Sequence, residues 1–160
     1  MRNIMLAGVL TCVSMTSWAG VAETKAKRGA DEVISQSANK MQQACGNTAL
    51  TVTVNWDEFD SMLAANKAQL AEKKYQDAWV LNHAGERTSA LLDSIAAICN
   101  DDADYQAEIA KLTAVVVMPK GDFADTKTDL ALADTSLTVQ SGHYMRRTAS
   151  DFTARIKALY

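Results

Sequence analysis

The sequence predicts a small α+β domain: an antiparallel sheet of about four strands, with helices packed mainly on one face and one disulfide. Helical periodicity dominates the chain, but it gives way to strand-like alternation or apolar runs in a few short segments. These segments are too few and too unevenly spaced for a sandwich, and they do not alternate with helices as in a doubly wound sheet. Two widely separated cysteines supply the disulfide. The 160 residues suffice for one domain, which we expect over residues 30–160.

The first residues have the three regions of a secretory signal peptide. Arg2 is the only charged residue before Glu23, and a nearly unbroken apolar run extends over residues 4–13. Ser17 and Ala19 then place small residues at the −3 and −1 positions of a cleavage site. The apolar run is shorter than the roughly 20 residues that a membrane-spanning helix needs. We therefore expect an export signal rather than a membrane anchor.

The expected signal peptide covers residues 1–19, with cleavage after Ala19 or, as the second choice, after Ala22. Residues 20–29 are then expected to form a flexible mature N-terminus. The mature protein is expected to contain no transmembrane segment and to reside in the periplasm or to be secreted.

Two cysteines remain outside the expected signal peptide, Cys45 and Cys99. An even number of cysteines in an oxidising compartment usually forms disulfides. Gly46 follows the first and a polar run follows the second, so each cysteine is expected near the end of a helix. A redox site would need a C-x-x-C pair or a lone thiol near a histidine, and the sequence offers neither spacing. We therefore expect a structural disulfide between Cys45 and Cys99.

The first half of the domain is predicted to contain a helix, a strand and further helices. Apolar residues at helical spacing predict a helix over residues 30–44. Over residues 50–56, β-branched and apolar residues alternate with polar ones, which is typical of a half-buried strand. Asn55 and Glu58 have the spacing of a capping box, so the next helix is expected to begin at Trp56.

After this strand, the chain is rich in helix-forming residues as far as Cys99. We expect two helices there, over about 56–74 and 76–99, either separate or fused. Gly85 weakens the second of them and is a candidate kink. The remaining expected elements are a short helix over 104–112, a central apolar strand over 113–119, a hairpin over 130–142 that turns at Asp134-Thr135, and an amphipathic helix over 145–159.

Composition and motifs argue against several classes of function. The full sequence has 16 basic and 19 acidic residues. Removal of Arg2 with the signal peptide leaves 15 basic residues and a net charge of about −4. This mild acidity, without a basic stripe, argues against a nucleic-acid partner. The spacings that zinc and calcium sites require do not occur, so we expect no metal and no cofactor. The sequence also lacks a glycine-rich phosphate loop and a G-x-S-x-G nucleophile motif.

A few residues are candidates for a binding site. His143 precedes the expected last helix, and with Arg146 and Arg147 it forms a small cationic cluster of the kind that holds an anion at a helix N-terminus. Trp79 lies off the apolar stripe of its helix, so we expect it to be partly exposed and to serve as an anchor for a partner. His83 lies one helical turn before Glu86, a spacing that suits an acid–base pair or two metal ligands, but we expect a solvent-facing histidine beside a glutamate.

The sequence favours an exported, non-enzymatic binding protein, because no motif has the residues or spacing that catalysis usually requires. Its expected partner is another protein, a component of the cell envelope or a small apolar ligand. The first alternative is a small periplasmic hydrolase that uses His83 or His143 with a nearby carboxylate. The second is a structural or assembly protein of the envelope, suggested by alanine-rich helical faces.

Overall fold

The computed structural model describes residues 17–160. Most of the expected signal peptide therefore lies outside the described residues. The elements are, in order, α1 (Ser17–Cys45), β1 (Thr51–Val54), α2 (Trp56–Ala65), α3 (Lys67–Glu72), α4 (Asp77–Asp101), α5 (Ala103–Ile109), β2 (Ala114–Pro119), β3 (Asp129–Ala133), β4 (Ser136–Ser141) and α6 (Ser150–Lys157). Helices combined with a four-stranded sheet confirm the predicted α+β class.

The sheet is mixed, so the expectation of an antiparallel sheet is wrong. Its strand order is β1-β2-β4-β3; β1 and β4 each pair with β2 in parallel, and β3 pairs with β4 antiparallel. The helices between β1 and β2 return the chain to the same end of the sheet, which makes that pair parallel. The loop after β2 carries the chain past one strand position to β3, and the hairpin then inserts β4 between β3 and β2.

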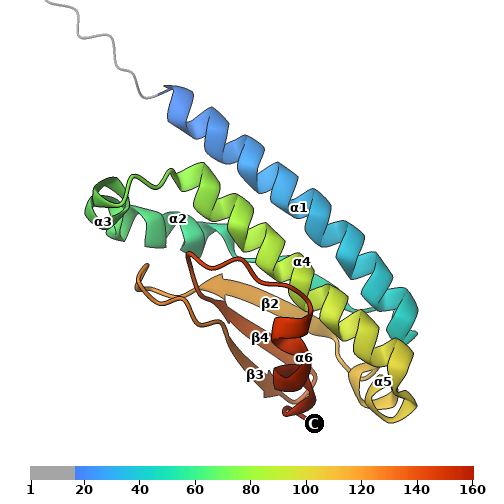
Figure 1. Cartoon of the computed structure of the whole chain (residues 1–160). Helices are drawn as coiled ribbons and strands as arrows, with labels where there is room; N and C mark the ends of the chain where they lie inside the picture. Colours follow the sequence, from blue (N-terminus) through green and yellow to red (C-terminus); the bar gives the residue numbers. More distant parts are fainter. Residues whose placement is uncertain (1–16) are drawn as a thin grey trace, which may run out of the picture.

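The helices cover one face of the sheet, as the sequence predicts. In β2 and β4 the side chains that alternate toward α4 are buried, as Val115, Val117, Leu137 and Val139 show. Their neighbours on the opposite face are only partly covered. Figure 1 shows α1, α4 and α6 on the same side of the strands. β2 lies inside the sheet, which confirms the central position predicted for the apolar segment over 113–119.

The two long helices, α1 and α4, run side by side in the same direction (Figure 1). Ala30 packs on Gly85, and Ser37 and Ser89 share a hydrogen bond of 2.6 Å. α1 begins much earlier than the predicted start near residue 30. Residues 20–29, expected to be flexible, belong to this helix, and Ala26 within them is buried. The two expected cleavage positions fall within its first turns.

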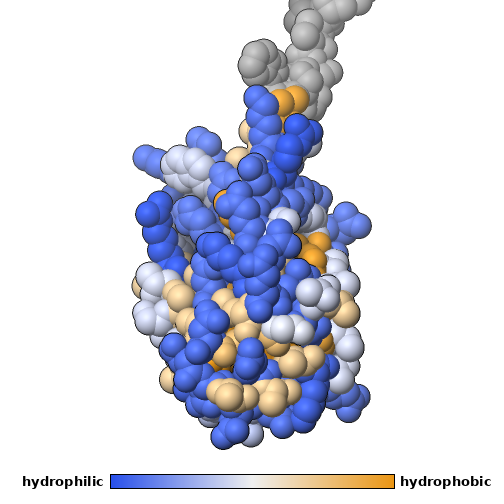
Figure 2. All heavy atoms as spheres, turned by 90° about the vertical axis from the view of Figure 1, so that its right-hand side faces the viewer, coloured by the Kyte–Doolittle hydropathy of each residue, from blue (hydrophilic) through white to orange (hydrophobic). Residues whose placement is uncertain are grey.

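A disulfide joins the last residue of α1 to the last part of α4. The Cys45 and Cys99 sulfurs are 2.10 Å apart, which confirms the predicted pair. Both cysteines are buried in the core that α1, α4 and the sheet enclose. Seen from the right-hand side of Figure 1, the surface is mostly hydrophilic, with pale and light orange residues gathered in its lower half (Figure 2).

Several local predictions are confirmed, and the predicted start of the last helix is wrong. Asn55 Oδ1 accepts a hydrogen bond from the Glu58 N–H at 3.3 Å, and α2 begins at Trp56 as the capping box predicts. The hairpin turns at Asp134, whose φ of 51° is left-handed. The last helix, however, begins at Ser150 instead of near residue 145. The residues before it form a loop that packs across the end of the sheet.

Candidate binding site at the carboxyl ends of the parallel strands

The carboxyl ends of β1, β2 and β4 lie at one edge of the sheet because these three strands are parallel. Such an edge is where open α/β sheets usually bind ligands, since the following loops project from it together. Here two loops meet there, residues 120–128 after β2 and residues 142–149 after β4. We call this region the carboxyl edge.

A lysine at the start of the first loop fixes that loop to the neighbouring hairpin. Lys120 Nζ lies 2.6 Å from Asp125 Oδ2 and 2.6 Å from Asp129 Oδ2. Hydrogen bonds to the two carboxylates raise the pKa of Lys120, and the ammonium group lowers the pKa of Asp125 and of Asp129. Lys120, which follows β2, thus forms ion pairs with its own loop and with the first residue of β3.

Arg87 of α4 extends to the carboxyl edge and is almost fully buried, at 3% exposure. Its Nε donates to Ser141 Oγ at 3.2 Å and its Nη1 to the Met145 carbonyl at 3.3 Å. Within residues 17–160 its Nη2 has no hydrogen-bond partner, and no carboxylate lies within ion-pairing distance. Burial, with a smaller effect from Arg147, lowers the pKa of Arg87 to about 10. The guanidinium therefore stays charged at neutral pH.

His143 lies in the second loop and is completely buried. Its Nε2 is 2.9 Å from the Lys120 carbonyl, which can only accept, so Nε2 carries the proton and Nδ1 is an acceptor. Nδ1 finds no partner among the described residues, and the same holds for the buried Tyr144 hydroxyl. Together with Arg87 Nη2, the loop thus encloses polar atoms of the kind that ordered water or a polar ligand satisfies.

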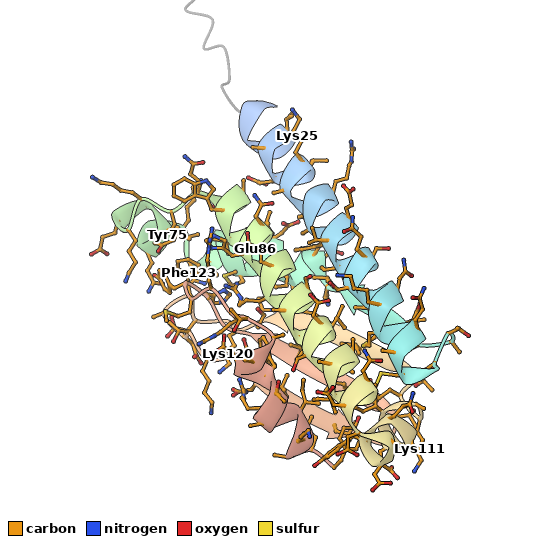
Figure 3. All side chains as sticks on the ribbon, turned by 45° about the vertical axis from the view of Figure 1, so that its right-hand side comes forward. Lys25, Tyr75, Glu86, Lys111, Lys120 and Phe123 are labelled. Carbon is orange, nitrogen blue, oxygen red and sulfur yellow. A yellow bond between two sulfur atoms is a disulfide. The ribbon has the colours of Figure 1, made fainter. Side chains whose placement is uncertain are left out.

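Aromatic rings form a platform over these polar groups; we define it as Tyr75, Trp79, Phe123 and Tyr144. The Tyr144 ring lies 4.5 Å from Phe123 and 5.1 Å from Tyr75, centroid to centroid, and Tyr75 contacts Trp79 at 6.5 Å. Lys73 Nζ lies 5.0 Å from the Tyr144 ring centre. Tyr144 has a φ of 66°, which is rare for a residue other than glycine. Figure 3 shows Tyr75, Phe123, Glu86 and Lys120 on the same side of the molecule.

Of the platform residues, Trp79 is the one that is exposed to solvent. Trp79 is 50% exposed, as predicted, and Met145, the residue after Tyr144, is 49% exposed. Arg146 is largely exposed and lies 3.9 Å from Glu86, while Arg147 Nη2 donates to the Thr126 carbonyl at 3.1 Å. The loop that contains the exposed Met145 therefore also carries two cationic side chains.

The structure brings the four sequence-predicted binding residues to one region but does not place three of them as expected. His143, Arg146 and Arg147 lie in the loop before α6 and not at a helix N-terminus, because α6 begins only at Ser150. His143 is also buried and therefore does not present a cation to solvent. Trp79 joins this region through Tyr75 and Tyr144. The grouping results from the β4–α6 loop folding back along α4.

Sequence reasoning missed Arg87, Tyr144 and the lysine–aspartate cluster. Arg87 carried a usable signal: it is spaced three residues after Ala84 and four before Leu91, so it lies within a second apolar stripe of α4. A charged residue in such a stripe is unusual because a buried charge requires compensation. The partners of Lys120 carried no signal, since Asp125 depends on the path of its loop and Asp129 on the position of β3.

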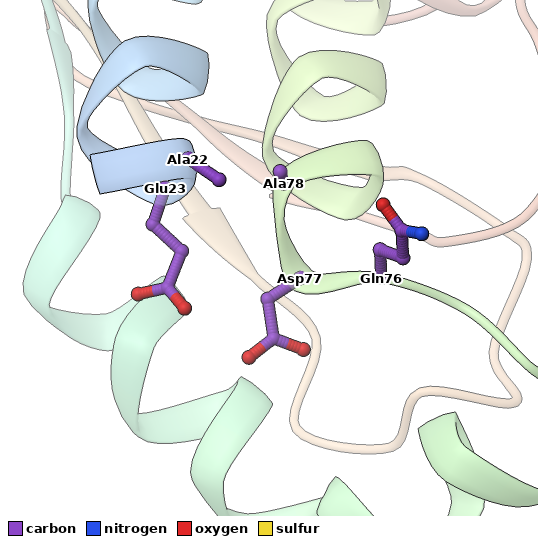
Figure 4. Close-up of a pocket in the computed structure, with 5 residues that line it drawn as sticks. All are labelled: Ala22, Glu23, Gln76, Asp77 and Ala78. Atoms are coloured by element: carbon purple, nitrogen blue, oxygen red, sulfur yellow. The ribbon is translucent and has the colours of Figure 1, made fainter. Parts of the chain in front are cut away.

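A separate hollow lies between the start of α1 and the start of α4. It is lined by Ala22, Glu23, Gln76, Asp77 and Ala78 (Figure 4). The carboxylates of Glu23 and Asp77 are turned to the same side in that view. Across residues 17–160, no group of three or more His, Cys, Asp or Glu side chains is arranged to hold a metal ion.

Comparisons with known proteins identify no relative: no family model, curated protein or solved structure matches this chain. Among the described helices, none is both long and apolar enough to cross a membrane. The disulfide fits a protein that folds in an oxidising compartment.

Burial of His143 predicts a pH dependence of stability. Burial lowers the pKa of His143; the nearby Arg87 acts in the same direction, and the Lys120 carbonyl and two aspartates oppose it. In the unfolded chain His143 binds a proton below about pH 6.5, whereas the folded protein resists that protonation. We therefore expect the free energy of unfolding to decrease as the pH falls from neutral through that value.

Urea unfolding across this pH range measures the effect. In the His143→Gln variant the decrease should be smaller than in the wild type, whatever the absolute stability of the variant. His83→Gln is the matched control, because it removes the other histidine and leaves His143 in place. Equal pH slopes for the wild type and His143→Gln would show that His143 is not held neutral.

Proposed function

We propose that this chain is an exported, non-enzymatic binding protein that holds a partner protein at the aromatic platform and Met145. The observation that carries the proposal is the exposure of Trp79 among rings that are themselves packed, with the exposed Met145 next in sequence to Tyr144. Tryptophan is enriched among the residues that dominate binding energy, and a rigid support lowers the entropy lost on binding. Export of the protein rests on the predicted signal peptide and is supported by the disulfide.

The charges around the platform favour a partner that presents an acidic residue next to an apolar one. Lys73 lies over Tyr144, and Arg146 extends into solvent with only a 3.9 Å contact to Glu86. Both cations can therefore pair with a carboxylate of the partner at the rim of the contact. Since the chain as a whole is acidic, this local cationic border would orient the partner as it approaches.

The hydrolase alternative lacks support from the geometry. His143 donates to a main-chain carbonyl and is closed off from solvent. Neither histidine forms a hydrogen bond to a carboxylate or hydroxyl within the described part of the chain. General acid–base catalysis needs such an arrangement, or at least access of the substrate to the imidazole.

The proposal predicts that Trp79→Ala weakens partner binding by at least about tenfold while leaving the protein folded. A photoreactive amino acid placed at position 79 or 145 in cells that produce the protein would first identify the partner by covalent capture. The affinity of the purified partner is then measured for the wild type and for Trp79→Ala and Met145→Ala.

Val33 provides the matched control, because it is an exposed apolar residue on α1, away from the platform. Capture at position 33 should not yield the same adduct, and Val33→Ala should bind like the wild type. If positions 79 and 145 capture no common protein, or if Trp79→Ala retains full affinity, the proposed site is wrong.

A further inference from the structure

The outer edge of the sheet at β1 is open. Thr51 N–H donates to the Thr113 carbonyl at 3.1 Å, and Asn55 N–H donates to the Val117 carbonyl at 2.8 Å. In a parallel ladder alternate residues bond to the same neighbour, so Val52 and Val54 direct their N–H and C=O groups away from β2. No strand of the described chain pairs with that side of β1. These main-chain groups are therefore free to pair with an added strand.

A groove runs along this open edge between β1 and α1, with a volume of about 280 Å³. Its apolar lining comes from Ile34 and Ala38 on α1 and from the two valines of β1. The polar residues that line it all come from α1, and they are Asp31, Ser35, Asn39 and Gln42. An added strand would thus meet main-chain hydrogen-bonding groups on one side and a helix on the other, with apolar contacts between them.

Two side-chain hydrogen bonds delimit the groove. At one end Gln42 Nε2 donates to the Leu50 carbonyl at 2.7 Å, which satisfies the acceptor preceding the open stretch. At the other end Trp56 Nε1 donates to Asp31 Oδ1 at 2.9 Å. α1 therefore forms hydrogen bonds to the residues that precede and follow β1. The outward main-chain groups of Val52 and Val54 between them stay unpaired.

We propose that this groove binds an extended segment of a partner protein, which adds to β1 as a further strand. Strand addition is a recurrent mode of peptide recognition, in which main-chain bonds supply affinity and side-chain pockets supply specificity. The segment would place an apolar side chain against Ile34 and Val52. It would place a lysine or arginine beside Asp31.

Charge supports the basic residue. Asp31 is the only charged residue among those that line the groove. Lys27, one helical turn before it, lies 2.6 Å from Asp60 and is engaged there. A cationic side chain of the bound segment would therefore meet a carboxylate that no lysine or arginine of residues 17–160 pairs with.

Selection from a displayed library of random short peptides on the oxidised protein tests the proposal. We expect selected peptides to share alternating apolar residues and a terminal lysine or arginine. Their affinity should fall at least about tenfold for Ser35→Trp, which fills the groove, and stay unchanged for Gln36→Trp, the adjacent exposed residue outside it. Thermal unfolding of both variants checks that they are folded.

N-methylation of the selected peptide distinguishes strand addition from simple filling of the groove. Only alternate peptide amides bond to β1, so methylation of one alternate set should abolish binding and methylation of the other should not. Hydrogen exchange at Val52 and Val54 should slow in the complex. The same effect from both sets of methyl groups, or no change at these two amides, would overturn the proposal.

Other outcomes separate this site from the aromatic platform. Peptides whose binding is lost in Trp79→Ala but retained in Ser35→Trp would overturn the groove and leave the platform supported. Self-association that Ser35→Trp abolishes in the absence of peptide would show that a second copy of the chain occupies the edge, which also overturns the proposal.

Discussion

Replacing Cys45 and Cys99 together by alanine is expected to lower the free energy of unfolding by about 4 kcal/mol. The bond joins residues separated by 54 positions, so it removes a large amount of conformational freedom from the unfolded chain. Domains of this size have net stabilities of about 5–15 kcal/mol, so the loss is a large part of the total. The variant should still fold at room temperature, since α1 and α4 remain packed along their lengths.

Urea unfolding of the oxidised wild type and of the double variant measures this effect, and a decrease in Tm of about 10 °C should accompany it. The control is a reductant: it should destabilise the wild type to nearly the level of the double variant and leave the variant unchanged. Mass spectrometry of natively purified protein should find no free thiol at either cysteine. Equal unfolding midpoints for the wild type and the variant would contradict the structural role of the bond.

The disulfide was predictable because it follows from composition and compartment rather than from the path of the chain. Two cysteines outside an expected signal peptide leave a single intramolecular pairing. Two local features of the backbone were equally predictable. The Asn55–Glu58 capping box and the turn at Asp134 depend only on residues close in sequence, and both occur in the structure.

Strand pairing was not predictable to the same degree. The hairpin of β3 and β4 was expected, but the sequence does not specify which of its strands lies beside β2. That choice depends on the loop over residues 120–128, which is long enough to pass one strand position. The parallel β1–β2 pair makes the sheet mixed in either case. Because β4 takes the inner place, its carboxyl end lies directly beside that of β2, so the loops that follow these two strands are neighbours and form the candidate site.

The candidate site was therefore predictable in its exposed part and hidden in its buried part. Trp79 could be identified because its helical position is off the apolar stripe. The environment of His143 could not, since its burial results from the loop over residues 142–149 folding across the sheet edge against residues 120–128. The predicted start of α6 is wrong for the same reason. Apolar residues at helical spacing begin at Met145, but residues 145–149 belong to the loop.

Gly85→Leu is expected to destabilise the protein by about 3 kcal/mol, because the two long helices touch at this position. A Cβ atom added at Gly85 would lie 2.5 Å from Ala30 Cβ and 2.8 Å from Ala30 Cα, and the second of these atoms is main chain. No rotation of a side chain can relieve such a contact, so α1 must move away from α4. Leucine is a better helix former than glycine by roughly 1 kcal/mol, so the loss has to come from packing.

Gly29→Ala is the matched control and has the opposite expected sign. Gly29 lies in α1 with no atom within 4 Å of an added Cβ, so alanine there should stabilise the protein by about 0.5–1 kcal/mol. Urea unfolding of both variants in the oxidised state measures the pair. If Gly85→Leu were as stable as the wild type, α4 would carry glycine there for a bend, as sequence reasoning suggested, and the close crossing with α1 would be wrong. Destabilisation at position 85 together with stabilisation at position 29 would show instead that α1 is held against α4 over the length that begins before residue 30.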